Sequence, residues 1–444
     1  MRAADLAACA LLVITGCSEP PPHSSPTSRQ SSPSQPATAS PSAHGTPVDG
    51  PLTVRSVVKV EQLVGDFDKH LKKSTTGKTL ERFGVEGADL GSTFEGAEGR
   101  LIFLFGDTIG TPGQNGKDAI GYTTATDPEK GVALDFYVRP DGKFLPFEPL
   151  GKGGKPQKLL GFEVPIAGSR LPSGTYVAYK TNHAGDEDGS KDDGPEADPT
   201  DITYLASFDE KTGAAKELCE LSRQPAGRFQ KISLHTVELD AAASPDTSVP
   251  ASDWLLMYGS GRHRESQVYL AVVPVRDFPT CSGVRYFTGL QGSKPAWSAR
   301  EADAAPVFDD AEAGVGEMSV TWVAPTKRWL ALYDNKQGHR KILARDAAKP
   351  WGPWTDPVEV FDPEKGGHGV FIHDPRSKPP DAVAGPMIGK NKDDPGSARG
   401  GAYAPFVIER WTRSEEAGLA VYFTLSVWNP YVVELMKVTF AAPR

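Results

Sequence analysis

Short runs of apolar and β-branched residues recur along most of the chain. They are rich in Val, Ile, Tyr, Phe and Trp, and clusters of Gly, Pro, Asp and Asn separate them, a pattern typical of strands joined by turns. The clearest runs are residues 101–105, 132–138, 175–179, 202–208, 229–234, 254–258, 267–273, 319–324, 329–333, 403–408, 419–425 and 432–438. Weaker runs bring the number of predicted strands to about eighteen to twenty, whereas only residues 61–72 suggest a helix. The sequence therefore predicts an all-β fold.

The number of strands favours a β-propeller. About twenty strands taken in fours make five four-stranded antiparallel blades, and a closed ring of blades leaves only short edge strands exposed. A stacked β-sandwich is the alternative. No second linker divides the chain after residue 50, so we expect residues 51–444 to form a single β-propeller domain.

The N-terminus resembles an export signal. Arg2 precedes a short apolar stretch, residues 6–14, which is too short to span a bilayer and is typical of a signal peptide. The sequence Val-Ile-Thr-Gly-Cys at residues 13–17 resembles the bacterial lipobox, whose cysteine is acylated. We therefore predict a lipoprotein signal peptide over residues 1–17 with lipidation of Cys17. An ordinary signal peptide with an incidental cysteine is the alternative.

Residues 18–50 are dominated by Pro, Ser, Thr, Ala and Gln. Such a segment cannot bury enough apolar surface to offset the entropy lost on ordering. We expect it to be a disordered tether that spans roughly 30 Å. The protein is then expected outside the cytoplasm, lipid-anchored to the cell membrane or the outer membrane.

The remaining composition limits the partners and the chemistry. The formal net charge is −9, so the basic stripe that binds nucleic acid is not expected. Beyond Cys9 and Cys17, two cysteines remain, Cys219 and Cys281; a disulfide and two buried thiols are both open. The sequence has no Gly-x-Ser-x-Gly elbow and no Gly-rich phosphate loop, which argues against a serine hydrolase and nucleotide chemistry.

Two aspartates stand at the same end of a predicted hairpin. Residues 87–94 and 100–108 flank the turn sequence Glu-Gly-Ala-Glu-Gly at residues 95–99. With the turn centred near residues 97 and 98, Asp89 lies opposite residue 106 or 107, so Asp89 and Asp107 come side by side. Like charges opposed in this way destabilise a hairpin, so their placement indicates a chemical role.

A carboxylate pair of this kind suits glycoside hydrolysis. Two carboxylates in one pocket cannot both ionise easily, so one remains a protonated acid and the other an ionised base, which is the division that the reaction requires. We predict Asp89 and Asp107 as the catalytic residues. The structural alternative is that one caps a turn and the other accepts hydrogen bonds from backbone amides.

A second hairpin repeats the theme more weakly. A turn at residues 325 and 326 sets Glu317 opposite Asp334. In a propeller, equivalent hairpin ends converge on one mouth of the central channel, so these two acidic residues are expected to support the site. The alternative is that Glu317 pairs with a neighbouring arginine.

Other polar clusters suit a carbohydrate ligand. Arg262 and Arg264 could bind hydroxyl or carboxylate groups, and Trp428 with Asn429 offers a stacking face beside an amide. His368 and His373 lack metal-ligand spacing, so we predict no catalytic metal and no cofactor. The acidic segment 182–200 does not fit an EF-hand.

Several motifs together resemble one known family. These motifs are Gly87-x-Asp89-Leu90-Gly91-Ser92, Leu104-Phe105-Gly106-Asp107-Thr108, Gly261-x-x-Arg264, Trp329-x-x-x-Tyr333 after Glu317, Tyr403-Ala404-Pro405 and Ser426-x-Trp428-Asn429-Pro430-Tyr431. The combination resembles the family catalogued as domain of unknown function 4185, over nearly the whole folded region. That family has five-bladed propellers similar to the arabinanase and fructosidase clan, and its characterised members cut inside D-arabinan, an α-linked arabinofuranose polymer of mycobacterial-type cell envelopes.

The resemblance implies a surface-tethered endo-acting arabinofuranan hydrolase with Asp89 and Asp107 as its acid and base and with Tyr403 near the site. Opposed strand positions allow either separation of the carboxyls, and inversion is favoured over retention. We expect a monomer whose partner is an arabinan-type polysaccharide, with the membrane contacted only through the lipid. Insertions at 182–200 and 374–400 would rim the substrate groove. A non-catalytic carbohydrate-binding propeller is the alternative of a different class.

Overall fold

The computed structural model describes residues 52–441 except 114, 160–162, 182–200, 263–265, 311–313, 336–339, 378–382 and 384–398. All of the described residues belong to one unit of the chain, Ser40–Arg444. The predicted signal peptide with Cys17, the tether, the acidic segment 182–200 and Arg264 lie outside the described residues.

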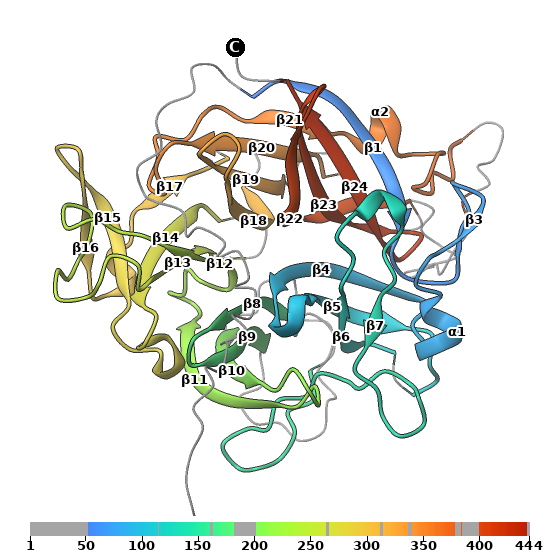
Figure 1. The fold of residues 1–444 in the computed structure, drawn as a ribbon, viewed down its shortest axis with the longest axis horizontal. Helices are drawn as coiled ribbons and strands as arrows, with labels where there is room; N and C mark the ends of the chain where they lie inside the picture. The colour runs from blue at the N-terminus through green and yellow to red at the C-terminus, as the bar shows by residue number, and fades with distance from the viewer. Residues whose placement is uncertain are drawn as a thin grey trace, which may run out of the picture. The chain divides into compact units, whose positions relative to one another are not determined.

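Five antiparallel sheets surround a common centre as the blades of a β-propeller (Figure 1). The first blade contains β4 (Gly87–Glu95), β5 (Leu101–Ile109), β6 (Lys117–Thr123) and β7 (Asp135–Phe136). The second contains β8 (Pro165–Leu171), β9 (Gly174–Thr181), β10 (Ile202–Phe208) and β11 (Ala215–Arg223). The third contains β12 (Lys231–Val237), β13 (Trp254–Ser260), β14 (Val268–Pro274), the hairpin of β15 (Arg285–Gln291) and β16 (Lys294–Ser298), and β17 (Pro306–Phe308), which pairs with β14.

The last two blades complete the ring. The fourth contains β18 (Val315–Val323), β19 (Arg328–Asn335), β20 (Ile342–Ala347) and β21 (Val358–Phe361). The fifth contains β22 (Gly401–Glu415), β23 (Gly418–Trp428), β24 (Val432–Phe440) and β1 (Val54–Gln62). The predictions of an all-β fold and of a five-bladed propeller are confirmed.

A few small elements lie outside the blades. They are β2 (Phe67–Asp68), β3 (Lys73–Ser74), the helices α1 (Thr79–Phe83) and α2 (Pro363–Gly366), and 3₁₀ turns at Ala97–Gly99, Pro128–Lys130, Phe278–Thr280 and Glu301–Asp303. Within the described residues, none of the helices has the length and apolar character needed to cross a membrane.

The helix predicted over residues 61–72 is wrong. This stretch ends β1 and then turns into the short pair β2 and β3. Gly65 takes a positive φ of 84°, which a helix does not allow. Asp68 then fixes the turn, because its carboxylate accepts the backbone N–H groups of Gln62 (3.1 Å) and Leu71 (2.9 Å).

Strand β1 closes the ring by pairing with β24, so both ends of the described chain meet in the fifth blade. A buried ion cluster reinforces this junction: the Lys59 Nζ lies 2.8 Å from Glu434 Oε1 and 3.1 Å from Asp68 Oδ1. Burial raises the pKa of Glu434 to about 7 even though Lys59 opposes the shift. Backbone pairing therefore holds the junction, and the buried charges of Lys59, Asp68 and Glu434 compensate one another within it.

The strands β4, β8, β12, β18 and β22 are the innermost strands of their blades (Figure 1). Serine side chains join the inner strands of neighbouring blades. Ser319 Oγ of β18 donates to the Pro405 carbonyl (3.0 Å) and accepts the Val407 N–H (2.9 Å) of β22. Ser233 Oγ of β12 makes the same two bonds to Val320 of β18, at 3.1 and 3.0 Å. Because such bonds satisfy backbone groups that no ladder reaches, the blades are fixed relative to one another.

Aromatic rings fill the space between the third and fourth blades. The Tyr258 ring of β13 lies 6.2 Å from the Trp329 ring of β19, and Trp322 of β18 lies 5.4 Å from Trp329. Trp329 is completely buried. Burial of such large side chains is the main favourable contribution to packing the sheets face to face.

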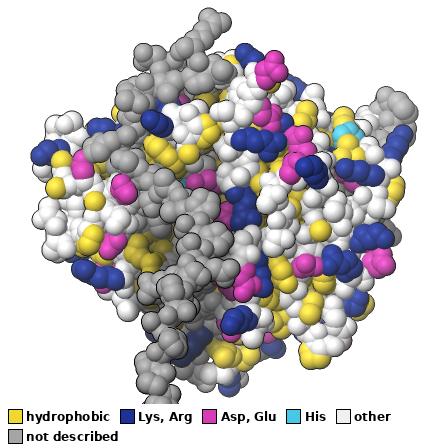
Figure 2. Space-filling view, in the orientation of Figure 1, with side chains coloured by type: hydrophobic (Ala, Val, Ile, Leu, Met, Phe, Trp, Pro, Cys, Tyr) yellow, Lys and Arg dark blue, Asp and Glu magenta, His cyan; other side chains and the backbone are white. Residues whose placement is uncertain are grey.

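Charged side chains of both signs are interspersed on the surface seen in Figure 2, where lysine and arginine lie next to aspartate and glutamate over the described residues. Mixed charges of this kind suit a surface that remains solvated.

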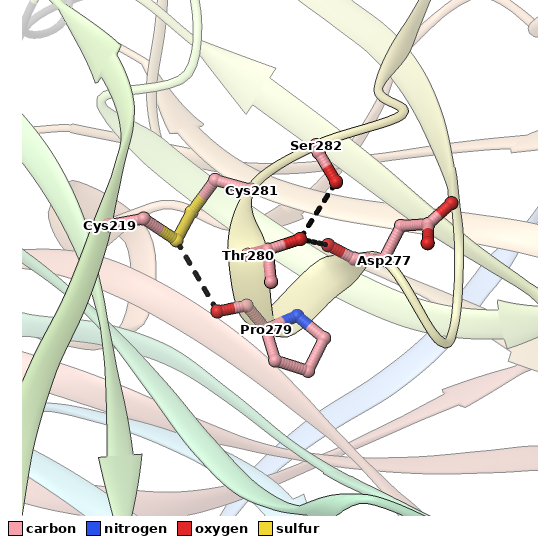
Figure 3. The surroundings of a disulfide bond; sticks show 6 residues. All are labelled: Cys219, Asp277, Pro279, Thr280, Cys281 and Ser282. Atoms are coloured by element: carbon pink, nitrogen blue, oxygen red, sulfur yellow. Dashed lines mark hydrogen bonds between the residues drawn. A yellow bond between two sulfur atoms is a disulfide. The ribbon is translucent and has the colours of Figure 1, made fainter.

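A disulfide joins the second blade to the third. It links Cys219 on β11 to Cys281, which follows the 3₁₀ turn Phe278–Thr280, with the Cα atoms 6.0 Å apart (Figure 3). The two cysteines are 62 residues apart in the sequence. The bond therefore restricts a long loop of the unfolded chain, and a loop of this length gives a large entropic stabilisation.

We expect replacement of both Cys219 and Cys281 by alanine to lower the free energy of unfolding by about 2–4 kcal/mol, because the unfolded chain regains the freedom of that loop. Urea denaturation of the oxidised protein and of the double variant measures the difference. A reductant should destabilise the unmodified protein and leave the double variant unchanged; equal stability of both proteins without reductant would contradict the prediction.

Candidate functional site

Asp89 and Asp107 lie side by side on the first two strands of the first blade. Asp89 of β4 pairs with Gly106 of β5, so Asp107 is the next residue along the neighbouring strand. This is the register that the hairpin pattern predicted. Both aspartates are partly exposed as residues, while the Oδ1 atom of each carboxyl is buried.

Gly106 provides the space for the Asp89 carboxylate. A Cβ atom built on Gly106 would lie 2.6 Å from Asp89 Oδ1 and 3.0 Å from a methyl group of Val164. Real Cβ atoms do not come this close to such neighbours, so any larger residue would push Asp89 away. Gly106 therefore contributes to the site because it has no side chain that would displace Asp89.

The two aspartates sit in different electrostatic surroundings. Burial raises the pKa of the Asp107 carboxyl well above its ordinary value, and the negative charges of Asp89 and Glu163 raise it further, while Lys180 opposes the shift. The Asp89 carboxylate accepts a hydrogen bond from the Tyr403 hydroxyl on β22 (2.9 Å). A donor of this kind stabilises an ionised carboxylate, so the environment favours a neutral Asp107 beside a charged Asp89.

A second tyrosine borders Asp89. Burial, and then the negative charge of Asp89, raise the pKa of Tyr431 well above its ordinary value. The Tyr431 ring also packs edge to face against Trp428, with the ring centres 6.2 Å apart. The fifth blade thus supplies two phenols to the carboxylate pair of the first blade.

A third aspartate, Asp118 on β6, was not predicted from the sequence. It is almost completely buried, and its Oδ1 accepts the backbone N–H of Asp107 (3.1 Å). Burial, followed by the negative charge of Asp107, raises the pKa of Asp118 well above its ordinary value. In the sequence it is a single acidic residue before an apolar run, which gives no local signal of its role.

The second blade adds charged groups that were not predicted from the sequence either. Glu163, which precedes β8, is buried and accepts a hydrogen bond from the Thr181 hydroxyl (2.6 Å). Lys180 of β9 is buried 3.2 Å from Asp201 Oδ2. Both residues act on the pKa of Asp107, in opposite directions, so neighbouring blades tune this carboxyl.

Glu317 and Asp334 form a buried connection between the fourth and fifth blades. The Asp334 Oδ1 accepts the backbone N–H of Glu317 (2.9 Å) and that of Ala404 (3.2 Å). Ala404 follows Tyr403, the residue that donates to Asp89. Asp334 therefore fixes the backbone next to Tyr403. Glu317 and Asp334 are neighbours, as predicted, and they meet through the Glu317 backbone N–H and the Asp334 carboxylate.

Backbone strain is concentrated around these residues. Ten of the described non-glycine residues have a positive φ. Four of them lie among or next to the residues described above: Leu90 (59°), Asp107 (41°), Ala404 (52°) and Asn429 (55°). Each such residue costs about 1–3 kcal/mol and persists only where its surroundings impose it, which is common at functional sites.

Residues 74–437 match the family described as Domain of unknown function (DUF4185). The chain belongs to this family. No curated protein matches the chain.

The solved structures that resemble this DUF4185 protein include a hydrolase-like protein and two arabinose-acting enzymes. The first is described as a putative hydrolase from Bacteroides ovatus (14% identity, 81% of this chain and 87% of that chain, TM-score 0.46). The others are an alpha-L-arabinofuranosidase from Podospora anserina (11% identity, 87% and 99%, TM-score 0.40) and an endo-1,5-alpha-L-arabinanase from Thermotoga petrophila (10% identity, 81% and 75%, TM-score 0.39).

The other predicted residues of this DUF4185 protein lie in different settings. Trp428 is partly exposed at the end of β23, and Asn429 is buried in the following turn, where its carbonyl accepts the His373 N–H (2.9 Å). Arg262 is exposed before β14. Arg340, which was not predicted, places its guanidinium 5.4 Å from the centre of the Tyr403 ring. Within the described residues, no three His, Cys, Asp or Glu side chains are grouped as metal ligands.

We expect Gly106→Ala to lower the free energy of unfolding by about 1–3 kcal/mol, because its methyl group would collide with Asp89 and Val164. Urea denaturation measures this change. Gly153→Ala is the matched control, since a Cβ atom at Gly153 meets nothing within 4 Å, and it should change the stability by less than about 0.5 kcal/mol. Equal stability of the two variants would show that the contact with Asp89 is not tight.

Proposed function

We propose that this protein is a glycoside hydrolase that cleaves internal α-D-arabinofuranosyl linkages of cell-envelope arabinan. The observation that carries the proposal is the side-by-side placement of Asp89 and Asp107, of which Asp107 is driven toward its neutral form while Asp89 accepts a hydrogen bond from Tyr403. One acid beside one base is what glycosidic cleavage needs.

In this proposal Asp107 is the general acid and Asp89 the general base. The Asp107 proton passes to the glycosidic oxygen as the bond from that oxygen to C1 breaks. A water molecule forms the new bond to C1 and gives its proton to Asp89, and exchange with solvent then restores both carboxyls. An inverting glycosidase needs its two carboxyls about 6.5–9.5 Å apart, and a retaining one needs them about 5–5.5 Å apart. We favour the inverting course.

The substrate class follows from the motifs that resemble the DUF4185 family, and the site is compatible with it. Trp428, partly exposed beside Tyr431, offers a face on which a sugar ring can stack. The same face would serve a carbohydrate-binding propeller without catalysis, so the two functions differ in whether the carboxylates are needed.

We expect Asp89→Asn and Asp107→Asn each to reduce the release of new reducing ends from D-arabinan by about 10²–10⁴-fold, because each removes one proton transfer. Asp141→Asn is the control: this exposed carboxylate lies in the turn beyond β7 and its loss should leave the rate unchanged. Wild-type protein that binds arabinan without cutting it, and binds equally well as the double Asn variant, would favour the binding module.

The rate should also depend on pH in a defined way. The neutral form of Asp107 is the active one, so the rate should fall as pH rises through its raised pKa, and it should fall at low pH when Asp89 gains a proton. The pH profile of kcat measures both limbs. An Asp107→Asn variant that keeps the alkaline limb would exclude Asp107 as the acid.

The proposal includes an anchor at Cys17, with the tether carrying the propeller to a polymer that cannot diffuse. We expect the full chain to incorporate labelled palmitate when expressed in a bacterium, and Cys17→Ala to abolish the label and release soluble protein. A wild-type chain that takes up no label would remove the anchor from the proposal.

A further inference from the structure

The strand that carries Asp107 bulges at that residue. Two residues of β5, Gly106 and Asp107, lie opposite one residue of β6, Asp118. The flanking pairs are Phe105 with Ala119 and Thr108 with Lys117. A bulge of this kind interrupts the ladder and redirects a side chain, and bulges are common next to active sites.

The bulge leaves the Asp107 N–H without a place in the β5–β6 ladder, and a side chain fills the gap. The Asp118 Oδ1 accepts this N–H at 3.1 Å. Asp107 holds its left-handed φ of 41° at the same point. Since a non-glycine residue adopts this conformation only where its neighbours impose it, the bond from Asp107 to Asp118 is part of what fixes the bulge.

The surroundings of Asp118 favour the neutral form of its carboxyl. It is 1% exposed, and its Oδ2 has no hydrogen-bond partner among the described residues. No lysine or arginine is among the groups that act on its pKa: burial and the negative charges of Asp107, Asp89 and Glu163 raise it, and the hydrogen bond from the Asp107 N–H opposes the shift. An isolated buried carboxylate would be very costly, so such a group keeps its proton.

From this geometry we infer that Asp118 is a positioning residue: as a neutral acid it accepts the Asp107 N–H and holds Asp107 in the bulge that sets its carboxyl beside Asp89. The inference rests on the proposed function in one respect, since Asp107 is taken to be the general acid. It adds that a side chain of β6, the third strand of the blade, determines where the acid points, although Asp107 itself has no backbone pair on that strand.

Two variants at Asp118 distinguish its role as a hydrogen-bond acceptor from any role of its ionisable proton. Asp118→Asn keeps an oxygen that accepts the Asp107 N–H and replaces the hydroxyl by an amide donor, so it mimics the neutral acid. Asp118→Ala leaves the N–H buried without an acceptor. We expect Asp118→Asn to keep kcat within about threefold and the native pH profile, and Asp118→Ala to lower kcat about 10–100-fold with little change in KM.

Hydrogen exchange of the Asp107 amide tests the same inference without any substrate. Exchange in Asp118→Asn should be as slow as in the wild type, and in Asp118→Ala at least about tenfold faster, because its hydrogen bond is gone. Unfolding supplies a second readout. Below its raised pKa the folded Asp118 holds a proton that the unfolded chain has lost, so wild-type stability falls as pH rises, and unfolding of Asp118→Asn should release about one proton fewer.

Glu434→Gln is the matched control. Glu434 is a buried carboxyl in the fifth blade whose pKa burial raises to about 7. Its replacement should also change the proton count, and should leave both kcat and the exchange of the Asp107 amide as they are in the wild type.

The outcomes are distinct. Loss of activity in Asp118→Asn as complete as in Asp118→Ala would overturn the inference, because a carboxyl would then be required. Native activity and slow exchange in Asp118→Ala would overturn it as well, and so would an unchanged proton count in Asp118→Asn, even if the alanine variant fails to fold. If the wild type cuts no polysaccharide, the proposed function fails, while exchange and proton count still decide the role of Asp118.

Discussion

Two carboxylates on neighbouring strands repel each other when both are charged. The surroundings of the first blade reduce this repulsion because they favour the ionised form of one carboxyl and the neutral form of the other. Asp89 is stabilised by a phenol from the fifth blade, and Asp107 is surrounded by groups that favour its neutral form. The remaining features of the site follow from this division. Gly106 makes room for one carboxylate, the bulge with Asp118 holds the other, and Asp334 fixes the segment that carries Tyr403.

Much of the fold could be predicted from the sequence because propeller strands are local features. The alternation of apolar runs and turn residues located the strands, and the turn between β4 and β5 fixed the register that places Asp89 beside Asp107. The helix expected at residues 61–72 failed for a local reason, because a single glycine with positive φ and one capping aspartate convert an apolar pattern into a turn.

The rest of the site could not be predicted because its partners are distant in the sequence. Glu163 and Lys180 come from the second blade, and Tyr403 is 314 residues from Asp89. Asp118 belongs to the same blade, yet it acts through a bulge. Residues 101–105 of β5 are all apolar and buried, so the sequence has no alternation in which the shift of one residue could be seen. Charged residues from different blades become neighbours only when the ring closes, so the sequence alone does not show which of them act on Asp107.

The sharing of the fifth blade between the two ends of the chain has a consequence for the order in which the protein can mature. Its outer strand is synthesised first and the three others last, so the ring cannot close before residue 440 has left the ribosome. Pairing across such a separation carries a large loop-closure entropy and is slow to form. Tyr403 meets Asp89 only in the closed ring, so an incompletely made chain holds its two carboxylates without the phenol that distinguishes them.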